Sequence, residues 1–215
     1  MESINKVELT GSIVDIYSVQ DYFAITLSVK KYAEMPKSEQ NIKDYPRVVW
    51  FGEAANALSG KFSQYDYVDV TAIADAALVT KDGRAVRRLT LVGKDIKPAK
   101  TRCENYFGVA PYVGASYEYK NIVMLRGSVI QTYSPDNTDN FSKFVVKVAG
   151  ARSFSYPEII CYAQTADFVK SNLAINDTVC VTGTIQTYAK EQVDGTRSHS
   201  TSIVCREIAV VNDKS

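Results

Sequence analysis

The sequence repeats itself once, and this duplication limits the folds that the chain can adopt. A pattern Asn-x-Val-x-Leu-x-Gly-Ser begins at Asn5 and begins again at Asn121. A Tyr-Pro dipeptide followed by an apolar strand recurs at Tyr45 and Tyr156. Solenoid repeats are about 20–50 residues long and need several copies for stability, so two long copies predict two similar domains instead. We place these domains at residues 1–98 and 121–215, with an aromatic-rich linker at 99–120.

The composition excludes several classes of protein. Hydrophobic residues make up 46% of the chain and charged residues 23%, which fits a globular protein and argues against disorder. No apolar run approaches the roughly 18 residues of a membrane span, and the polar N-terminus lacks the apolar stretch of a secretory signal. We therefore expect a cytoplasmic protein. The net charge is only +1, so any site for a polyanion must come from local clusters of cations.

The four cysteines and the single histidine, His199, give no sign of a catalytic or metal site. No pair of cysteines has C-x-x-C spacing, and Cys161 and Cys180 alternate with apolar residues, as small core side chains do. His199 has no identifiable acid–base partner, and it is expected to be an exposed polar residue of a hairpin. We find no nucleophile–base pair and no Gly-rich phosphate loop with mechanistic spacing. The sequence therefore predicts no enzyme activity, no metal and no cofactor.

Apolar and polar residues alternate with a period of two through each copy, which indicates antiparallel strands with one buried face. Each copy also has one helical segment after its third strand, and Asp82-Gly83 is a strong hairpin signal. Three strands, a helix and two strands form the element order of the OB-fold, a five-stranded Greek-key barrel. We thus expect an all-β chain of two tandem OB-folds. The expected strands lie near 7–13, 23–29, 47–51, 67–73 and 86–92, and near 122–131, 142–148, 158–162, 178–186 and 200–205, with helices at 52–58 and 164–172.

These motifs resemble the bacterial-type single-stranded DNA-binding protein family. The resemblance rests on Asn5-Lys6-Val7-x-Leu9-x-Gly11, on Tyr45-x-Arg47-Val48-Val49-x-Phe51-Gly52 before the Ala-rich helix, and on the later hairpin. Members of that family are OB-folds that coat single strands, and their third strand typically carries aromatic-x-Arg-Val-x-x-aromatic-Gly. The resemblance implies non-catalytic binding of single-stranded DNA, with little sequence preference, that protects and unfolds the strand in replication or recombination.

The third strand of each copy carries the aromatic residues that the resemblance assigns to base stacking. Strand alternation places Tyr45, Arg47, Val49 and Phe51 on one face, with Val48 and Trp50 facing the core. Every base has a π-face, and a guanidinium can contact phosphate or stack, so such a face suits a single strand. The family's stacking positions correspond to Tyr45 and Phe51, and in the second copy to Tyr156 and Tyr162. The alternative is that these aromatics are strand formers packed on their neighbours.

Local clusters of cations complete the predicted site. Lys30-Lys31-Tyr32 lies where the second strand enters its loop, close to another stacking position of the family, although an exposed Lys pair is often a solvated strand end. A basic hairpin beside a barrel face suits an electrostatic funnel for the strand. The hairpin of the first copy supplies Lys81, Arg84, Arg87 and Arg88, and that of the second supplies Tyr188, Lys190 and Arg197.

The second copy differs from the first at one charged position. Glu158 stands where the first copy has Arg47. A carboxylate repels phosphate, so we predict that the second domain binds more weakly or by a different path.

Partners and alternatives follow from the same resemblance. Many family members end in a tail with an acidic tip that recruits other enzymes, and the sequence after the last expected strand predicts no such recruitment. A tailless tandem form suits a phage- or plasmid-encoded protein in the host cytoplasm. Family members often present four OB-folds as homotetramers, so a homodimer of this two-domain chain is one expectation. The alternatives are an OB-fold protein-interaction module of a replication complex and an RNA-binding variant.

Overall fold

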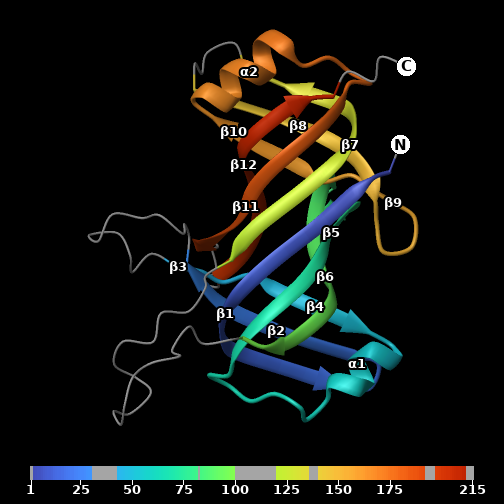
Figure 1. Ribbon diagram of the computed structural model, residues 1–215, viewed down its shortest axis with the longest axis vertical. Coiled ribbons are helices and arrows are strands. Elements are labelled where there is room, and N and C mark those ends of the chain that lie inside the picture. Colours follow the sequence, from blue (N-terminus) through green and yellow to red (C-terminus); the bar gives the residue numbers. More distant parts are fainter. Residues whose placement is uncertain are drawn as a thin grey trace.

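The structure, a computed structural model, describes residues 2–30, 43–81, 83–99, 120–135, 140–191 and 197–211. Two barrels stand end to end, with α1 at one end of the molecule and α2 at the other (Figure 1). The N-terminal half holds β1 (Ile4–Val19), β2 (Tyr22–Lys30), β3 (Lys43–Asp44), β4 (Arg47–Phe51), α1 (Glu53–Leu58), β5 (Tyr67–Lys81) and β6 (Arg84–Pro98). The C-terminal half holds β7 (Asn121–Tyr133), β8 (Phe141–Ala149), β9 (Phe154–Ser155), β10 (Glu158–Tyr162), α2 (Gln164–Asn172), β11 (Thr178–Glu191) and β12 (Arg197–Val210).

Backbone pairing closes each half into a barrel of five strands. In the first half β1 pairs antiparallel with β2 and β5, β2 with β4, and β5 with β6, while β4 runs parallel to β6 and closes the ring. The same pairings recur in the second half, among β7, β8, β10, β12 and β11. A helix follows the third barrel strand in both halves. The prediction of two tandem OB-folds is therefore confirmed, and the short strands β3 and β9 are additions that the periodicity did not predict.

The opening motif of each copy is explained by the barrel core and by close strand contacts. Val7 and Leu9 are buried in the first barrel, and the same positions of the repeat are buried in the second. Burying such a side chain contributes about 1.5–3 kcal/mol relative to leaving it exposed. A Cβ atom added at Gly11 would lie 2.5 Å from the carbonyl oxygen of Ser28, so this approach of β1 to β2 requires glycine. Gly127 stands in the same relation to β8.

The asparagine of the motif supplies side-chain hydrogen bonds to the neighbouring strand at the point where the backbone ladder between the two strands ends. The β1–β5 pairing ends at Val7 and Ala72, and beyond it the Asn5 side chain bonds both backbone groups of Ala74, each at 2.9 Å. Asn121 repeats this arrangement on Ile185: its Nδ2 donates to the carbonyl oxygen at 2.9 Å, and its Oδ1 accepts from the backbone N–H at 2.8 Å. Each amide therefore bonds both backbone groups of one residue at the point where the ladder ends.

Replacing Asn121 with alanine should lower the free energy of unfolding by about 2 kcal/mol, because it leaves two backbone groups of the fully buried Ile185 unpaired. Urea denaturation followed by far-UV circular dichroism measures the change. The matched control is Asn172→Ala, which removes one exposed bond to the carbonyl of Phe168 and should change stability by less than about 0.5 kcal/mol. Equal effects of the two substitutions would contradict this role of Asn121.

The two barrels are joined by a strand pair with pseudo-two-fold symmetry. β1 pairs antiparallel with β7, so that one continuous 12-stranded sheet runs through the molecule. Val7 is paired with Val123, which occupies the same position in the second copy, and the pseudo-two-fold axis passes between them. One chain thus builds an isologous contact of the kind that usually joins two identical subunits.

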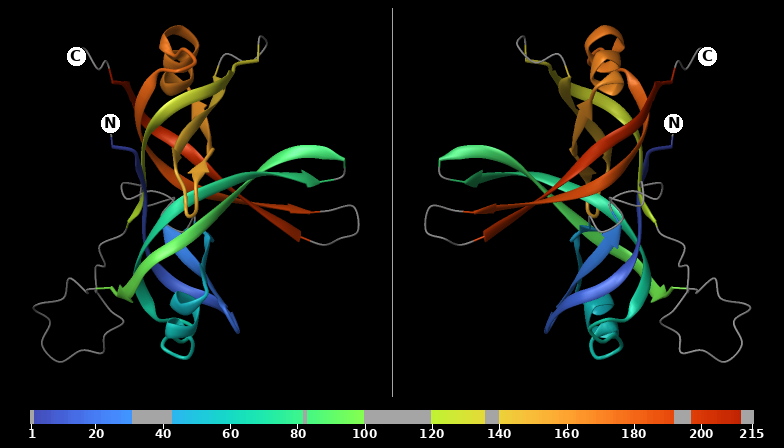
Figure 2. Two further views of the ribbon diagram at one scale, coloured as in Figure 1. Left: turned by 90° about the vertical axis from the view of Figure 1, so that its right-hand side faces the viewer. Right: turned by 90° about the vertical axis from the view of Figure 1, so that its left-hand side faces the viewer.

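The last two strands of each barrel extend into long two-stranded arms. β5 and β6 stay paired to Lys81 and Arg84, and β11 and β12 stay paired to Glu191 and Arg197. The strands are therefore longer than the predicted 67–73, 86–92, 178–186 and 200–205. Both arms project to the same side of the molecule and cross each other (Figure 2). Each arm thus lies against the opposite half.

The base of each arm is hydrogen-bonded to the short strand of the opposite barrel. The backbone N–H of Ala76 in β5 donates to the Ser155 hydroxyl at 2.7 Å, and the backbone N–H of Tyr156 donates to the Ala76 carbonyl at 3.3 Å. The backbone N–H of Thr187 in β11 donates to the Asp44 carboxylate at 2.7 Å. The Thr187 hydroxyl accepts from the backbone N–H of Tyr45, also at 2.7 Å. These bonds fix the direction in which each arm leaves its barrel.

One equivalent pair of core positions is filled by different side chains in the two barrels. Trp50 in β4 is buried, as predicted, and a Cβ atom at Gly93 of β6 would lie 2.0 Å from its indole ring. The parallel register of β10 and β12 places Cys161 and Cys205 at the equivalent pair of positions, and both are buried. A hydrogen bond with Cys161, together with burial, raises the pKa of the Cys205 thiol well above its ordinary value. Cys205 is therefore a protonated core side chain packed beside Cys161, while Cys180 is partly exposed.

Candidate nucleic-acid interface

Strand β4 presents Arg47 and Phe51 on the outside of the first barrel. Phe51 is 49% exposed and Arg47 is exposed, while Val48 and Trp50 are buried, as the alternation predicts. Val49 is an exception, because it shares the outward face but is only 5% exposed. Tyr45 is 48% exposed and precedes the strand. Tyr45 and Phe51 are six positions apart in the sequence, about 20 Å in an extended chain, so Tyr45 lies before the start of β4 and Phe51 at its end.

Three aromatic rings and one cation gather on the outer surface of β1, β2 and β4. The ring centroids of Tyr17 and Tyr22 are 5.9 Å apart, and those of Tyr22 and Phe51 are 5.6 Å apart, both edge-to-face. The guanidinium carbon of Arg47 is 5.9 Å from the Tyr17 ring centroid. We call Tyr17, Tyr22, Arg47 and Phe51 the first aromatic face. Sequence reasoning missed Tyr17 and Tyr22 as site residues, although Tyr17 recurs as Tyr133 in the repeat.

The second barrel carries an equivalent group of side chains. Tyr133 and Tyr162 are 51% and 47% exposed, and the Phe141 and Tyr162 ring centroids are 5.8 Å apart. Lys143 lies with its Nζ 5.2 Å from the Tyr133 ring centroid. Phe141 pairs with Tyr162 across β8 and β10, just as Tyr22 pairs with Phe51 across β2 and β4. We call Tyr133, Phe141, Lys143, Glu158 and Tyr162 the second aromatic face.

Glu158 is not an isolated carboxylate on this face. Its Oε2 lies 3.0 Å from Nζ of Lys143, and both side chains are about one-third exposed. Lys143 pairs with Ile160 in the ladder, where the first barrel pairs Ala24 with Val49. The second copy has therefore gained an anion on one strand and a cation on its neighbour. The prediction that the second domain binds more weakly or by a different path assumed a free carboxylate. The structure instead places this carboxylate in an ion pair with Lys143, which has no net charge.

Removing the anion of this pair should raise the affinity for an anionic strand, and removing the cation should lower it. Glu158→Gln frees Lys143 and should tighten binding about threefold, whereas Lys143→Ala leaves an unpaired carboxylate and should weaken binding about threefold or more, since each exposed pair is worth about 0.2–1 kcal/mol. Titration of a labelled single strand at low salt measures both. The double variant should bind nearly as the wild type does, and weaker binding by Glu158→Gln would contradict the proposed balance.

The other predicted site residues lie on the arms or at strand ends. Lys30 ends β2 and pairs with Lys43. Arg87 and Arg88 are adjacent residues of β6, so they point to opposite faces of the arm. Tyr188 is 40% exposed on β11, and its hydroxyl bonds the Gln186 side chain at 2.8 Å. Tyr156 is partly buried at the base of the first arm. Lys31 and Tyr32 lie outside the described residues, as do the side chains of Lys81, Arg84, Lys190 and Arg197.

The described ranges contain no group of three His, Cys, Asp or Glu side chains that could hold a metal ion. Within the same ranges, no helix is both long and apolar enough to cross a membrane.

Comparison with known proteins gives a match at the level of structure. No protein-family model matches the sequence, and no curated protein matches it either. The chain is similar in structure to the wild-type single-stranded DNA binding protein from Thermus aquaticus, with a TM-score of 0.70 and 16% sequence identity over 100% of this chain and 96% of that one. A deletion mutant of the same Thermus protein gives a TM-score of 0.69, 17% identity and coverage of 100% and 97%. The two-barrel fold of the whole chain is thus shared with these structures.

Proposed function

We propose that this protein binds single-stranded DNA along its two aromatic faces, without catalysis and with little sequence preference. The observation that carries the proposal is that both barrels present aromatic rings at equivalent positions, and that a cation lies beside the rings in each barrel. Base–aromatic stacking contributes about 1–3 kcal/mol per base and tolerates any sequence, and cations beside the rings can contact phosphates. The Thermus aquaticus proteins with this fold are named single-stranded DNA binding proteins, which agrees with this proposal.

The proposed role is to protect and unfold single strands in replication or recombination, in the cytoplasm of the cell or host. We assign one binding unit to residues 1–98 and one to 121–215, with 99–120 between them. A homodimer would present four barrels, and RNA could occupy the same aromatic faces. Recruitment of enzymes through an acidic tail is not part of the proposal.

A protein-docking module is the second candidate. A net charge of +1 and the exposed apolar side chains of the first arm, of which Leu78 is 64% exposed, favour it. Exposed apolar groups are common at protein interfaces, whereas strong attraction to nucleic acid usually comes with a basic surface.

Titration of fluorescein-labelled oligo-dT, followed by anisotropy at several salt concentrations, distinguishes the two candidates. A labelled strand is needed because Trp50, the only tryptophan, lies in the first core and does not face the strand. A DNA binder should show a linear fall of log affinity with log salt, with a slope of about −0.7 per phosphate contact. Oligo-rU measures the RNA preference, and duplex DNA is the control. An absence of oligo-dT binding at low salt would leave the docking module as the better candidate.

A further inference from the structure

We propose that Arg87, on the arm of the first half, completes the binding face of the second half. The inference rests on the proposed function, and it makes the second site a composite of both halves. The arm is held in place at its base, where the Ser155 hydroxyl accepts from the Ala76 N–H and donates to the Ala74 carbonyl at 3.0 Å. Ser155 is fully buried, so this anchor is protected from solvent. Arg87 follows just beyond the anchor, paired with Leu78 in the arm.

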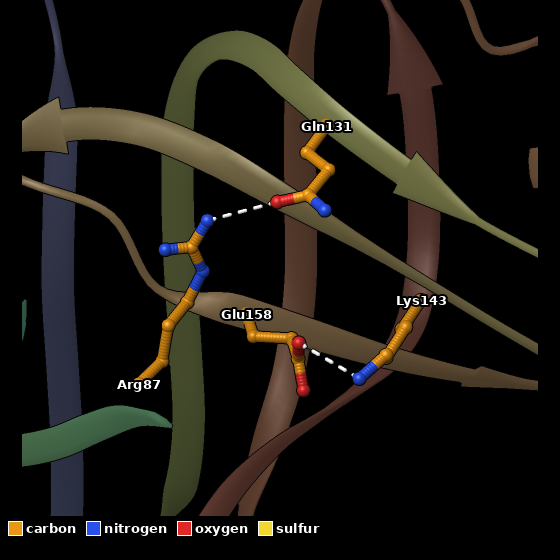
Figure 3. A network of polar contacts seen from close by, with 4 residues as sticks. All are labelled: Arg87, Gln131, Lys143 and Glu158. Atoms are coloured by element: carbon orange, nitrogen blue, oxygen red, sulfur yellow. Dashed lines mark hydrogen bonds and ion pairs between the residues drawn. The ribbon is translucent and has the colours of Figure 1, made fainter. Parts of the chain in front are cut away.

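The guanidinium of Arg87 reaches across to the second barrel. Its Nη2 donates to Oε1 of Gln131 at 2.9 Å, and Gln131 belongs to β7. Tyr133 lies two residues further along the same strand and therefore on the same side of it. Figure 3 shows two pairs, Arg87 with Gln131 and Glu158 with Lys143, and the ladder places them near each other because Gln131 and Glu158 both pair with Val145 of β8. Arg87 therefore belongs by position to the second aromatic face, although it comes from the first half of the chain.

The charges of the patch give this placement a chemical consequence. Glu158 and Lys143 cancel each other, so the second barrel alone offers no net cation among these residues. Arg87 restores a net positive charge at the same place. A guanidinium has five N–H donors in a fixed fork, and the bond to Gln131 uses one of them, so the group can be oriented and still bind a phosphate in bidentate fashion.

The first aromatic face has its own cation and does not need this help. Arg47 lies beside Tyr17 within the same barrel. The second arm has His199 where the first has Arg87, because His199 pairs with Ala189 just as Arg87 pairs with Leu78. His199 is exposed, as predicted. The fixed charge is therefore on the barrel strand in the first half and on the opposite arm in the second.

The test combines Arg87→Ala with aromatic substitutions in oligo-dT titrations. Arg87→Ala should weaken binding about tenfold at low salt and reduce the salt slope by about 0.7, the value for one phosphate contact on a single strand. The loss in Arg87→Ala/Tyr133→Ala should be at least about threefold smaller than the product of the single losses, because Tyr133 lies two residues from the Gln131 that Arg87 contacts and neighbouring residues couple. The loss in Arg87→Ala/Phe51→Ala should equal that product, because Phe51 lies on the first face.

The matched control is Arg88→Ala, which removes the same charge from the opposite face of the arm. Its loss should be smaller and should show no coupling to Tyr133→Ala. The salt slope separates a phosphate contact from a structural effect, since displacement of the arm alone would not remove one ion from the slope. Wild-type binding with an unchanged affinity for Arg87→Ala, or coupling of Arg87 to Phe51 and not to Tyr133, would overturn this inference alone. Absence of wild-type binding would overturn the proposed function, and this inference with it.

Discussion

Gly93→Cys should be among the most destabilising single substitutions in the first half, and combining it with Trp50→Cys should cost less than the two single losses added together. A Cβ at position 93 would clash with the indole ring of Trp50, 2.0 Å from its nearest atom. The surrounding strands would have to move, and overpacking of this kind costs about 3 kcal/mol or more. Trp50→Cys alone leaves a cavity in the same core, at a cost of about 3–5 kcal/mol by analogy with Trp→Ala.

The double variant reproduces the pair that the second half uses at this position, Cys161 with Cys205. Its loss of unfolding free energy should be smaller than the sum of the two single losses by about 1–3 kcal/mol, the usual coupling between contacting residues. Denaturation in the presence of a reductant, followed by far-UV circular dichroism, measures the cycle. Ala85→Cys, at an exposed position of the arm, is the control for the added thiol. Additive losses would show that Trp50 and Gly93 are not a matched packing pair.

Removing one ring from each aromatic face should give the largest loss of DNA affinity. Phe51→Ala and Tyr162→Ala each delete a half-exposed ring that contacts a second ring of its face. If each ring stacks one base, each substitution costs about 1–3 kcal/mol, and the pair costs about 2–6 kcal/mol, a loss of about 30-fold to 10⁴-fold. Titration with oligo-dT at constant salt measures all three variants.

Tyr65→Ala is the control for this series. Tyr65 is 76% exposed in the turn before β5, and it belongs to neither face. Its loss should leave the affinity within about twofold of the wild type. Tyr45→Ala and Tyr156→Ala should have smaller effects than Phe51→Ala and Tyr162→Ala, because both residues lie at the bases of the arms. Unchanged affinity after the loss of Phe51 and Tyr162 together would contradict stacking on these faces.

Sequence periodicity predicted the barrels well because each barrel strand has one buried and one exposed face. The prediction of strands failed where a strand no longer has one buried face. Residues 77–80 of the first arm are all exposed, so no alternation marks the strand, and the predicted strand stopped at Ile73. The crossing of the arms leaves no trace in local sequence either. The contact between Arg87 and Gln131 joins the two halves of the chain, and neither residue shows this in its own copy.

The repeat itself contained more information than the periodicity. Alignment of the two copies places Trp50 with Cys161 and Gly93 with Cys205. In the first copy a large side chain faces a glycine, and in the second copy two small side chains face each other. Such a compensating exchange is typical of two positions that pack against each other. The change from Arg47 to Glu158 was visible in the same way, but its partner Lys143 lies on another strand. Only the folded structure joins them, through the ion pair between β8 and β10.

The pairing of β1 with β7 also affects how the molecule can change over generations. Two identical chains that meet about a two-fold axis must carry every mutation twice, so a residue that suits one side must suit the other. A covalent pair of barrels has no such restriction, and its halves stay together at any dilution because their effective concentration is set by the chain. The first half can keep Trp50 in its core and Arg47 on a barrel strand. The second half can acquire two thiols in its core and take its cation, Arg87, from the arm of the first half. Duplication within one chain thus permits a division of labour that a symmetric dimer cannot evolve.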